Sequence, residues 1–113
     1  HGIIKIAGYG NAMLVEKGKF AEVASNMLTN LPIRRAPETL TTPAQFSTRS
    51  DCWDFGMLSY EVFSNGEKPW KGEREEIERQ IRKGDTPRLP SAPFIVTTLI
   101  NALWTISPAH RPT

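Results

Sequence analysis

The stretch from residue 51 to 64 constrains the fold more than any other part of the sequence. Ser50 is a favourable N-cap and Asp51 suits a first helical turn. Asn65-Gly66 then supplies a stop signal, which predicts a helix over 51–64. Large apolar residues fall on nearly every face of this helix: Trp53, Phe55, Met57, Leu58, Tyr60, Val62 and Phe63. A helix that is apolar all round must be buried on all sides, so the rest of the chain has to cover it.

Further helices are predicted downstream. One runs over 73–83, is apolar on a single narrow face and ends at Gly84. Another runs over 94–104 and carries a broader apolar stripe. Ser107-Pro108, an N-cap followed by proline at the first helical position, predicts the start of one more helix.

The N-terminal half carries weaker signals. Residues 3–7 form a short run rich in β-branched side chains, which predicts a strand that leads into a turn at residues 8–10. From 14 to 50 we find no sustained period of 2 or 3.6, apart from a helical turn expected after Pro37. Irregular segments of this length are uncommon in compact domains and are usually functional or disordered.

Charge and cysteine content narrow the function classes. The 14 basic and 12 acidic residues give a net charge of +2, without a run of five like charges, so nucleic-acid and membrane-surface partners are not expected. Cys52 is the only cysteine, which excludes an intrachain disulfide and fits the cytoplasm. No apolar run reaches the roughly 18 residues of a membrane span. The first residue, His1, and the last three, Arg111-Pro112-Thr113, are typical of a chain cut from a longer one.

Three motifs in order carry a family resemblance: Ala36-Pro37-Glu38, then Ser50-Asp51-Cys52-Trp53-Asp54-Phe55-Gly56, then Arg111-Pro112-Thr113. Together they resemble the C-terminal lobe of a protein kinase. Leu31-Pro32-Ile33-Arg34 and the run from Glu61 to Trp70 are similar to the tyrosine-kinase group, nearest to Fes/Fer-like non-receptor enzymes. The resemblance covers almost the whole chain.

The resemblance implies a mainly α fold, a partial kinase C-lobe that lacks the N-lobe and the catalytic loop. It divides residues 1–113 into a strand with a degenerate Asp-Phe-Gly region (1–13), an activation-segment-like stretch (14–50) and a helical subdomain (51–113). In the family, the Gly-rich loop, the strand lysine and the His-Arg-Asp loop all precede the position of His1.

The residues aligned with the family's Asp-Phe-Gly are Gly8, Tyr9 and Gly10. Gly8 has no side chain with which to hold Mg²⁺, a cation that requires oxygen ligands. Without the resemblance, Gly8 and Gly10 simply flank a tight turn, and that interpretation predicts no metal either. We therefore expect no catalytic, cofactor-binding or metal-binding residue in this chain, although the family implies ATP and Mg²⁺ for the parent domain.

The resemblance also assigns non-catalytic roles. Leu31, Pro32, Ile33 and Arg34 resemble the platform that supports residues next to a substrate tyrosine, although one residue is missing before Ala-Pro-Glu. Glu38 resembles the glutamate that pairs with the arginine at Arg111. Without the resemblance, Glu38 would be interpreted as an acid in a first helical turn and Arg111 as a surface charge. Asp51 resembles the helix aspartate that accepts backbone hydrogen bonds from the catalytic loop. In this chain it either faces solvent or is a buried acceptor without its partner.

Three functional hypotheses remain open at this point. The chain is the C-lobe portion of a domain that transfers the γ-phosphate of ATP to protein tyrosine, and is inactive alone. Alternatively it is a pseudokinase-type interaction module that uses Trp70 and the helix over 73–83 to bind a protein substrate or docking protein. A truncated piece without independent function is the third. We also expect exposed apolar surface near Trp53, Met57 and Tyr60, which would favour self-association.

Overall fold

The computed structural model describes residues 2–24 and 33–113. The described part is mainly helical, as predicted. In chain order its elements are the 3₁₀ turn η1 (Tyr9–Asn11), strand β1 (Ala21–Val23), the 3₁₀ turn η3 (Pro37–Leu40), strand β2 (Ala44–Phe46), helices α1 (Thr48–Phe63), α2 (Arg74–Lys83) and α3 (Phe94–Leu103), and the 3₁₀ turn η4 (Pro108–His110).

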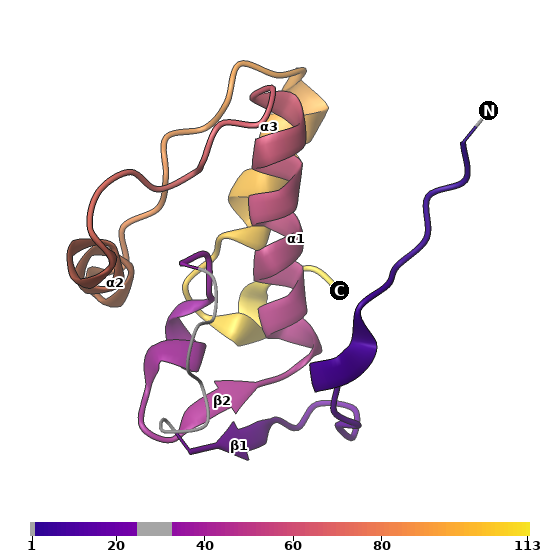
Figure 1. Ribbon diagram of the computed structural model, residues 1–113, viewed down its shortest axis with the longest axis vertical. Coiled ribbons are helices and arrows are strands. Elements are labelled where there is room, and N and C mark those ends of the chain that lie inside the picture. The colour runs from indigo at the N-terminus through magenta and orange to yellow at the C-terminus, as the bar shows by residue number, and fades with distance from the viewer. Residues whose placement is uncertain (1, 25–32) are drawn as a thin grey trace.

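Helix α1 stands at the centre of the molecule, with α3 behind it and α2 set apart to one side (Figure 1). It begins earlier than predicted, because Ser47 rather than Ser50 is the N-cap. The Ser47 hydroxyl accepts from the Arg49 amide, and the Ser50 hydroxyl accepts from the Ser47 amide. Ser50 is thus the N3 residue of a capping box whose N-cap is Ser47.

The core lies where α1 packs against α3. It consists of Ala36, Trp53, Met57, Tyr60, Ile100 and Trp104, with Trp70 and Val96 packed against it. The expectation of exposed surface near Trp53, Met57 and Tyr60 is therefore wrong, since their exposed fractions are 0%, 0% and 8%. The other face of α1 is the exposed one: Phe55, Leu58, Val62 and Phe63 are all 44% exposed or more.

The stretch 14–50 is less irregular than predicted. β1 and β2 form an antiparallel pair in which Ala21 faces Phe46, Glu22 faces Gln45 and Val23 faces Ala44. Strands of three residues are too short to show a period in the sequence. The turn expected after Pro37 does form, as η3.

The strand predicted over 3–7 is absent. Ile3, Ile4 and Ile6 are each more than 80% exposed, and the segment extends away from the helices without a paired strand in the described residues (Figure 1). A strand depends on a hydrogen-bonded neighbour, so β-branched composition alone does not produce one.

Helices α2 and α3 lie within a residue of their predicted bounds. α2 buries Ile77 and Ile81 and ends at Gly84, whose φ of 91° is readily adopted only by glycine. Ser107-Pro108 begins a short 3₁₀ turn, η4, instead of the expected α-helix. None of the described helices combines the length and apolarity needed to cross a lipid bilayer.

Candidate functional site

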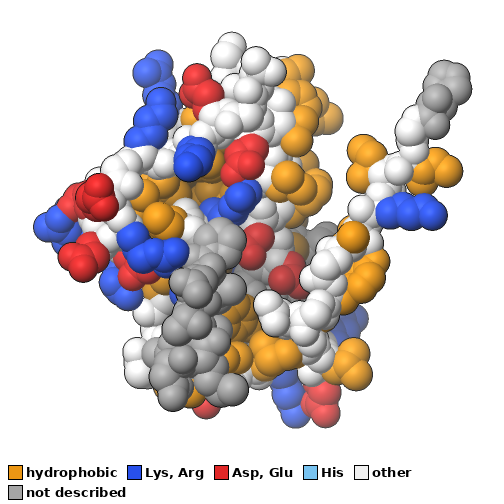
Figure 2. Space-filling view, in the orientation of Figure 1, with side chains coloured by type: hydrophobic (Ala, Val, Ile, Leu, Met, Phe, Trp, Pro, Cys, Tyr) orange, Lys and Arg blue, Asp and Glu red, His pale blue; other side chains and the backbone are white. Residues whose placement is uncertain are grey.

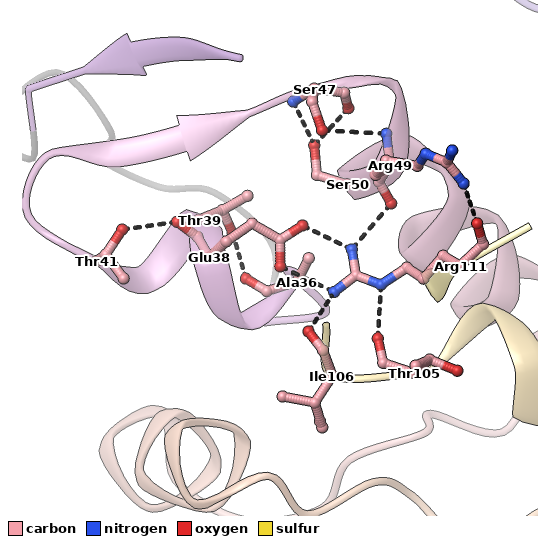
Figure 3. A network of polar contacts seen from close by, with 10 residues as sticks. All are labelled: Ala36, Glu38, Thr39, Thr41, Ser47, Arg49, Ser50, Thr105, Ile106 and Arg111. Atoms are coloured by element: carbon pink, nitrogen blue, oxygen red, sulfur yellow. Dashed lines mark hydrogen bonds and ion pairs between the residues drawn. The ribbon is translucent and has the colours of Figure 1, made fainter. Parts of the chain in front are cut away.

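A buried ion pair joins two segments that are far apart in the sequence (Figure 3). Arg111 Nη1 donates to Glu38 Oε1 at 2.6 Å, and Arg111 Nη2 donates to Glu38 Oε2 at 2.9 Å. This is the two-pronged geometry that a planar guanidinium and a carboxylate allow. The structure thus brings together the two residues that the sequence motifs singled out.

Other donors of Arg111 are used as well. Its Nε donates to Thr105 O at 2.7 Å, Nη1 also donates to Arg49 O at 2.9 Å, and Nη2 to Ile106 O at 3.1 Å. The guanidinium also lies 5.1 Å from the Trp53 ring centroid. Arg111 is 1% exposed, so these partners compensate a cation that has lost its water. The network ties η3, the start of α1 and the segment after α3 into one unit.

The expected substrate platform is described only in part, because Leu31 and Pro32 lie outside the described residues. Ile33 and Arg34 line a pocket of about 420 Å³ together with Glu61, Trp70 and Ile77. Arg34 Nη1 lies 2.5 Å from Glu61 Oε1, which anchors the segment to the C-terminal half of α1. The sequence analysis missed Glu61 as a partner, and its separation of 27 residues from Arg34 gave no local signal.

Asp51, the residue that resembles the family's helix aspartate, lies in the first turn of α1 and is exposed to solvent. One turn on, Asp54 is also partly exposed, yet crowding and charge raise its pKa to about 7. Partial desolvation of the carboxyl is the largest cause, followed by the negative charges of Asp51 and Glu38. Arg34 and Arg35 act in the opposite direction. Asp54 was not among the residues that the sequence analysis singled out.

Comparison with known proteins identifies the family of this chain. The family model for protein tyrosine and serine/threonine kinases matches residues 1–113. This chain belongs to the protein kinase family.

Its relatives include proteins named as tyrosine kinases and proteins named as inactive tyrosine kinases. The chain is 34% identical over 113 residues to megakaryocyte-associated tyrosine-protein kinase of Mus musculus, covering 97% of this chain and 21% of that protein. It is 30% identical over 110 residues to tyrosine-protein kinase Srms of Homo sapiens, covering 96% and 22%. Inactive tyrosine-protein kinase 7 of Gallus gallus is 35% identical over 85 residues, covering 73% and 8%. The chain thus spans about a fifth of the first two relatives.

The kinase family implies ATP and Mg²⁺, so we tested whether the residues present fit a metal. Gly8 has a left-handed φ of 82° and no side chain, and Tyr9 is 66% exposed. Across residues 2–24 and 33–113, no group of three His, Cys, Asp or Glu residues could hold an ion. Gly8, Tyr9 and Gly10 carry no carboxylate, so this position does not fit Mg²⁺, which takes carboxylate oxygens together with substrate phosphates.

An Asp-Phe-Gly sequence does occur in this kinase-family chain, at residues 54–56. It cannot supply the metal-binding aspartate that the family has at the position of Gly8. It lies within α1, where a Cβ on Gly56 would meet Trp104 Nε1 at 2.8 Å. The glycine there allows two helices to approach, and the aspartate belongs to a helix surface rather than to a loop over phosphates.

Proposed function

We propose that this chain is the C-lobe portion of a protein-tyrosine-kinase-like domain and catalyses no phosphoryl transfer by itself. The observation that carries the proposal is Gly8, which offers no oxygen ligand where the family has a metal-binding carboxylate. The 113 residues also contain no His-Arg-Asp sequence to supply a catalytic base. Two relatives whose names call them inactive support the same conclusion. They are inactive tyrosine-protein kinase 7 of Gallus gallus and, at 33% identity, inactive tyrosine-protein kinase kin-32 of Caenorhabditis elegans.

The family reaction, transfer of the ATP γ-phosphate to a protein tyrosine, thus belongs in our proposal to a parent domain. We place that parent among Fes/Fer-like non-receptor kinases in the cytoplasm, on the strength of the run from Glu61 to Trp70 and the lone cysteine. No cofactor is assigned to this chain alone.

Two measurements test the proposal. With Mg-ATP and a poly-Glu-Tyr substrate, we expect phosphate transfer no faster than in a blank without protein, while an active tyrosine kinase domain serves as the positive control. Mg-ATP should also leave the melting temperature of the chain unchanged, since a ligand that binds only the native state would raise it. Turnover above the blank would refute the proposal.

A protein-interaction role is the second candidate, and the pocket of about 420 Å³ favours it. Its lining combines apolar Trp70 and Ile77 with the Arg34–Glu61 pair, a mixture that suits a protein side chain. Such a surface requires neither metal nor nucleotide.

Affinity capture with two alanine variants tests this role. Trp70→Ala should lose the captured partner, because buried aromatic anchors carry much of the binding energy of an interface. Phe94→Ala is the matched control, since Phe94 is 84% exposed and does not line the pocket. Equal capture by the two variants would remove the pocket as the docking surface.

A further inference from the structure

A small polar pocket lies where α2 packs against η3 and the residues around it. Its volume is about 220 Å³, and its lining includes Arg35, Thr39, Thr41, Thr42, Glu78 and Arg82. Pockets that take drug-sized molecules are larger, roughly 300–1,000 Å³. The dimensions therefore suit a single small chemical group rather than a nucleotide.

The charges around this pocket are unbalanced. Arg74 Nη1 lies 3.4 Å from Glu78 Oε1, and Arg82 Nη2 lies 3.5 Å from Glu78 Oε2. The positive charges of Arg74 and Arg82 both act to lower the pKa of Arg35. Glu78 attracts Arg35, as does Asp54 more weakly. The charged side chains that line the pocket are the cations Arg35 and Arg82 and the acid Glu78, so this lining carries a net positive charge.

Arg35 is held in place but incompletely paired. Its guanidinium lies 5.8 Å from the Phe46 ring centroid, and Nη2 donates to Thr39 O. Its Nε is buried and has no hydrogen-bond partner among the described residues. Burial also lowers the pKa of Arg35, the largest of the influences on it. A partly desolvated cation with an unpaired donor is stabilised by an anion.

We propose that this pocket binds a phosphate group, free or as a monoester, between the guanidinium groups of Arg35 and Arg82. Arginine suits this ligand because its planar fork matches two phosphate oxygens at once. The guanidinium of Arg35 lies over the Phe46 ring, while Arg82 approaches from α2, where its Nη2 lies 3.4 Å from Leu40 O. Glu78 opposes the anion and limits its affinity.

Nuclear magnetic resonance titrations at constant ionic strength test the site, with inorganic phosphate, phosphotyrosine amide and phosphothreonine amide as probes. We expect saturable shifts of the Arg35 and Arg82 Nε–H signals. Arg82→Met should weaken binding about tenfold, because a hydrogen bond to a charged group contributes that order of free energy. Glu78→Gln should strengthen binding severalfold by removing the opposing charge.

The matched control is Arg79→Met, on the same helix, since Arg79 pairs with Glu76 and does not line the pocket. Its affinity should equal that of the unaltered chain. Tighter binding of a monoester than of inorganic phosphate identifies a phosphorylated side chain as the source, and the reverse identifies the free anion. Absence of saturable shifts, or equal effects of Arg82→Met and Arg79→Met, overturns the proposal.

Discussion

At the scale of single residues, the Glu38–Arg111 pair is the contact whose loss should cost most. Glu38→Gln keeps the size of the side chain but leaves Arg111, which is 1% exposed, as a cation without its carboxylate. Removing one partner of a buried pair typically costs about 3–5 kcal/mol of unfolding free energy. Urea denaturation should show a loss near the lower bound, because the carbonyls of Arg49, Thr105 and Ile106 still accept from Arg111. Glu67→Gln, at an exposed position, is the control and should change stability little.

A second prediction at this scale concerns pH. The pKa of Asp54 in the folded chain is about 7, above its usual value of 3.8, so the native state binds this proton more tightly than the unfolded state. Ionisation therefore opposes folding, and stability should fall as the pH rises from about 4 to 7. Solvent screening reduces the effect, since part of the side chain is exposed. Asp54→Asn should flatten the dependence of the urea midpoint on pH over this range. An unchanged slope would contradict the prediction.

At the scale of elements, the contact between α1 and α3 depends on Gly56. A Cβ at this position would lie 2.8 Å from Trp104 Nε1 and 3.1 Å from Leu103 Cβ, distances at which one helix has to move. Gly56→Ala would gain about 1 kcal/mol in helix propensity but lose about 1–3 kcal/mol to overpacking. We expect net destabilisation in thermal or urea unfolding. Ser59→Ala, also on α1, is the comparison: if it destabilises as much as Gly56→Ala, crowding at Gly56 is not the cause.

At the scale of the whole molecule, apolar side chains remain on the surface. Orange side chains run along one side of the helical body, and more lie on the N-terminal segment (Figure 2). On α1 the most exposed are Phe55, Leu58 and Val62, at 53%, 51% and 66%. Contiguous apolar surface of this kind favours association. We therefore propose that the isolated chain self-associates through this face.

The double variant Leu58→Lys, Val62→Glu tests this proposal. Analytical ultracentrifugation should show association of the unaltered chain and a shift toward monomer in the variant, with little change in its melting temperature because both side chains are solvent-exposed. Trp53 and Met57 are unsuitable targets, since both are fully buried. A monomeric unaltered chain at high concentration would contradict the proposal.

Local signals were sufficient to predict α1, α2 and α3, although the helix expected from Ser107-Pro108 is only a 3₁₀ turn. The stop at Gly84 and the apolar spacing of Ile77 and Ile81 depend on neighbours within a few turns, so α2 was predicted to within a residue. Two of the wrong interpretations, the strand over 3–7 and the exposed face of α1, required distant partners. Residues 3–7 have no neighbouring strand in the part of the chain that the structure describes, and the periodicity of α1 could not indicate which face α3 would cover.

What the sequence alone determined was the three α-helices and, through spaced motifs, the kinase family. Helix formation depends on contacts three and four residues apart, and each motif is a short contiguous sequence. Both can therefore be found without coordinates. Only the tertiary structure decided which face of α1 is buried, that Arg34 meets Glu61, and that Arg35 and Arg82 share a pocket. These outcomes depend on how segments tens of residues apart pack together, which no local pattern specifies.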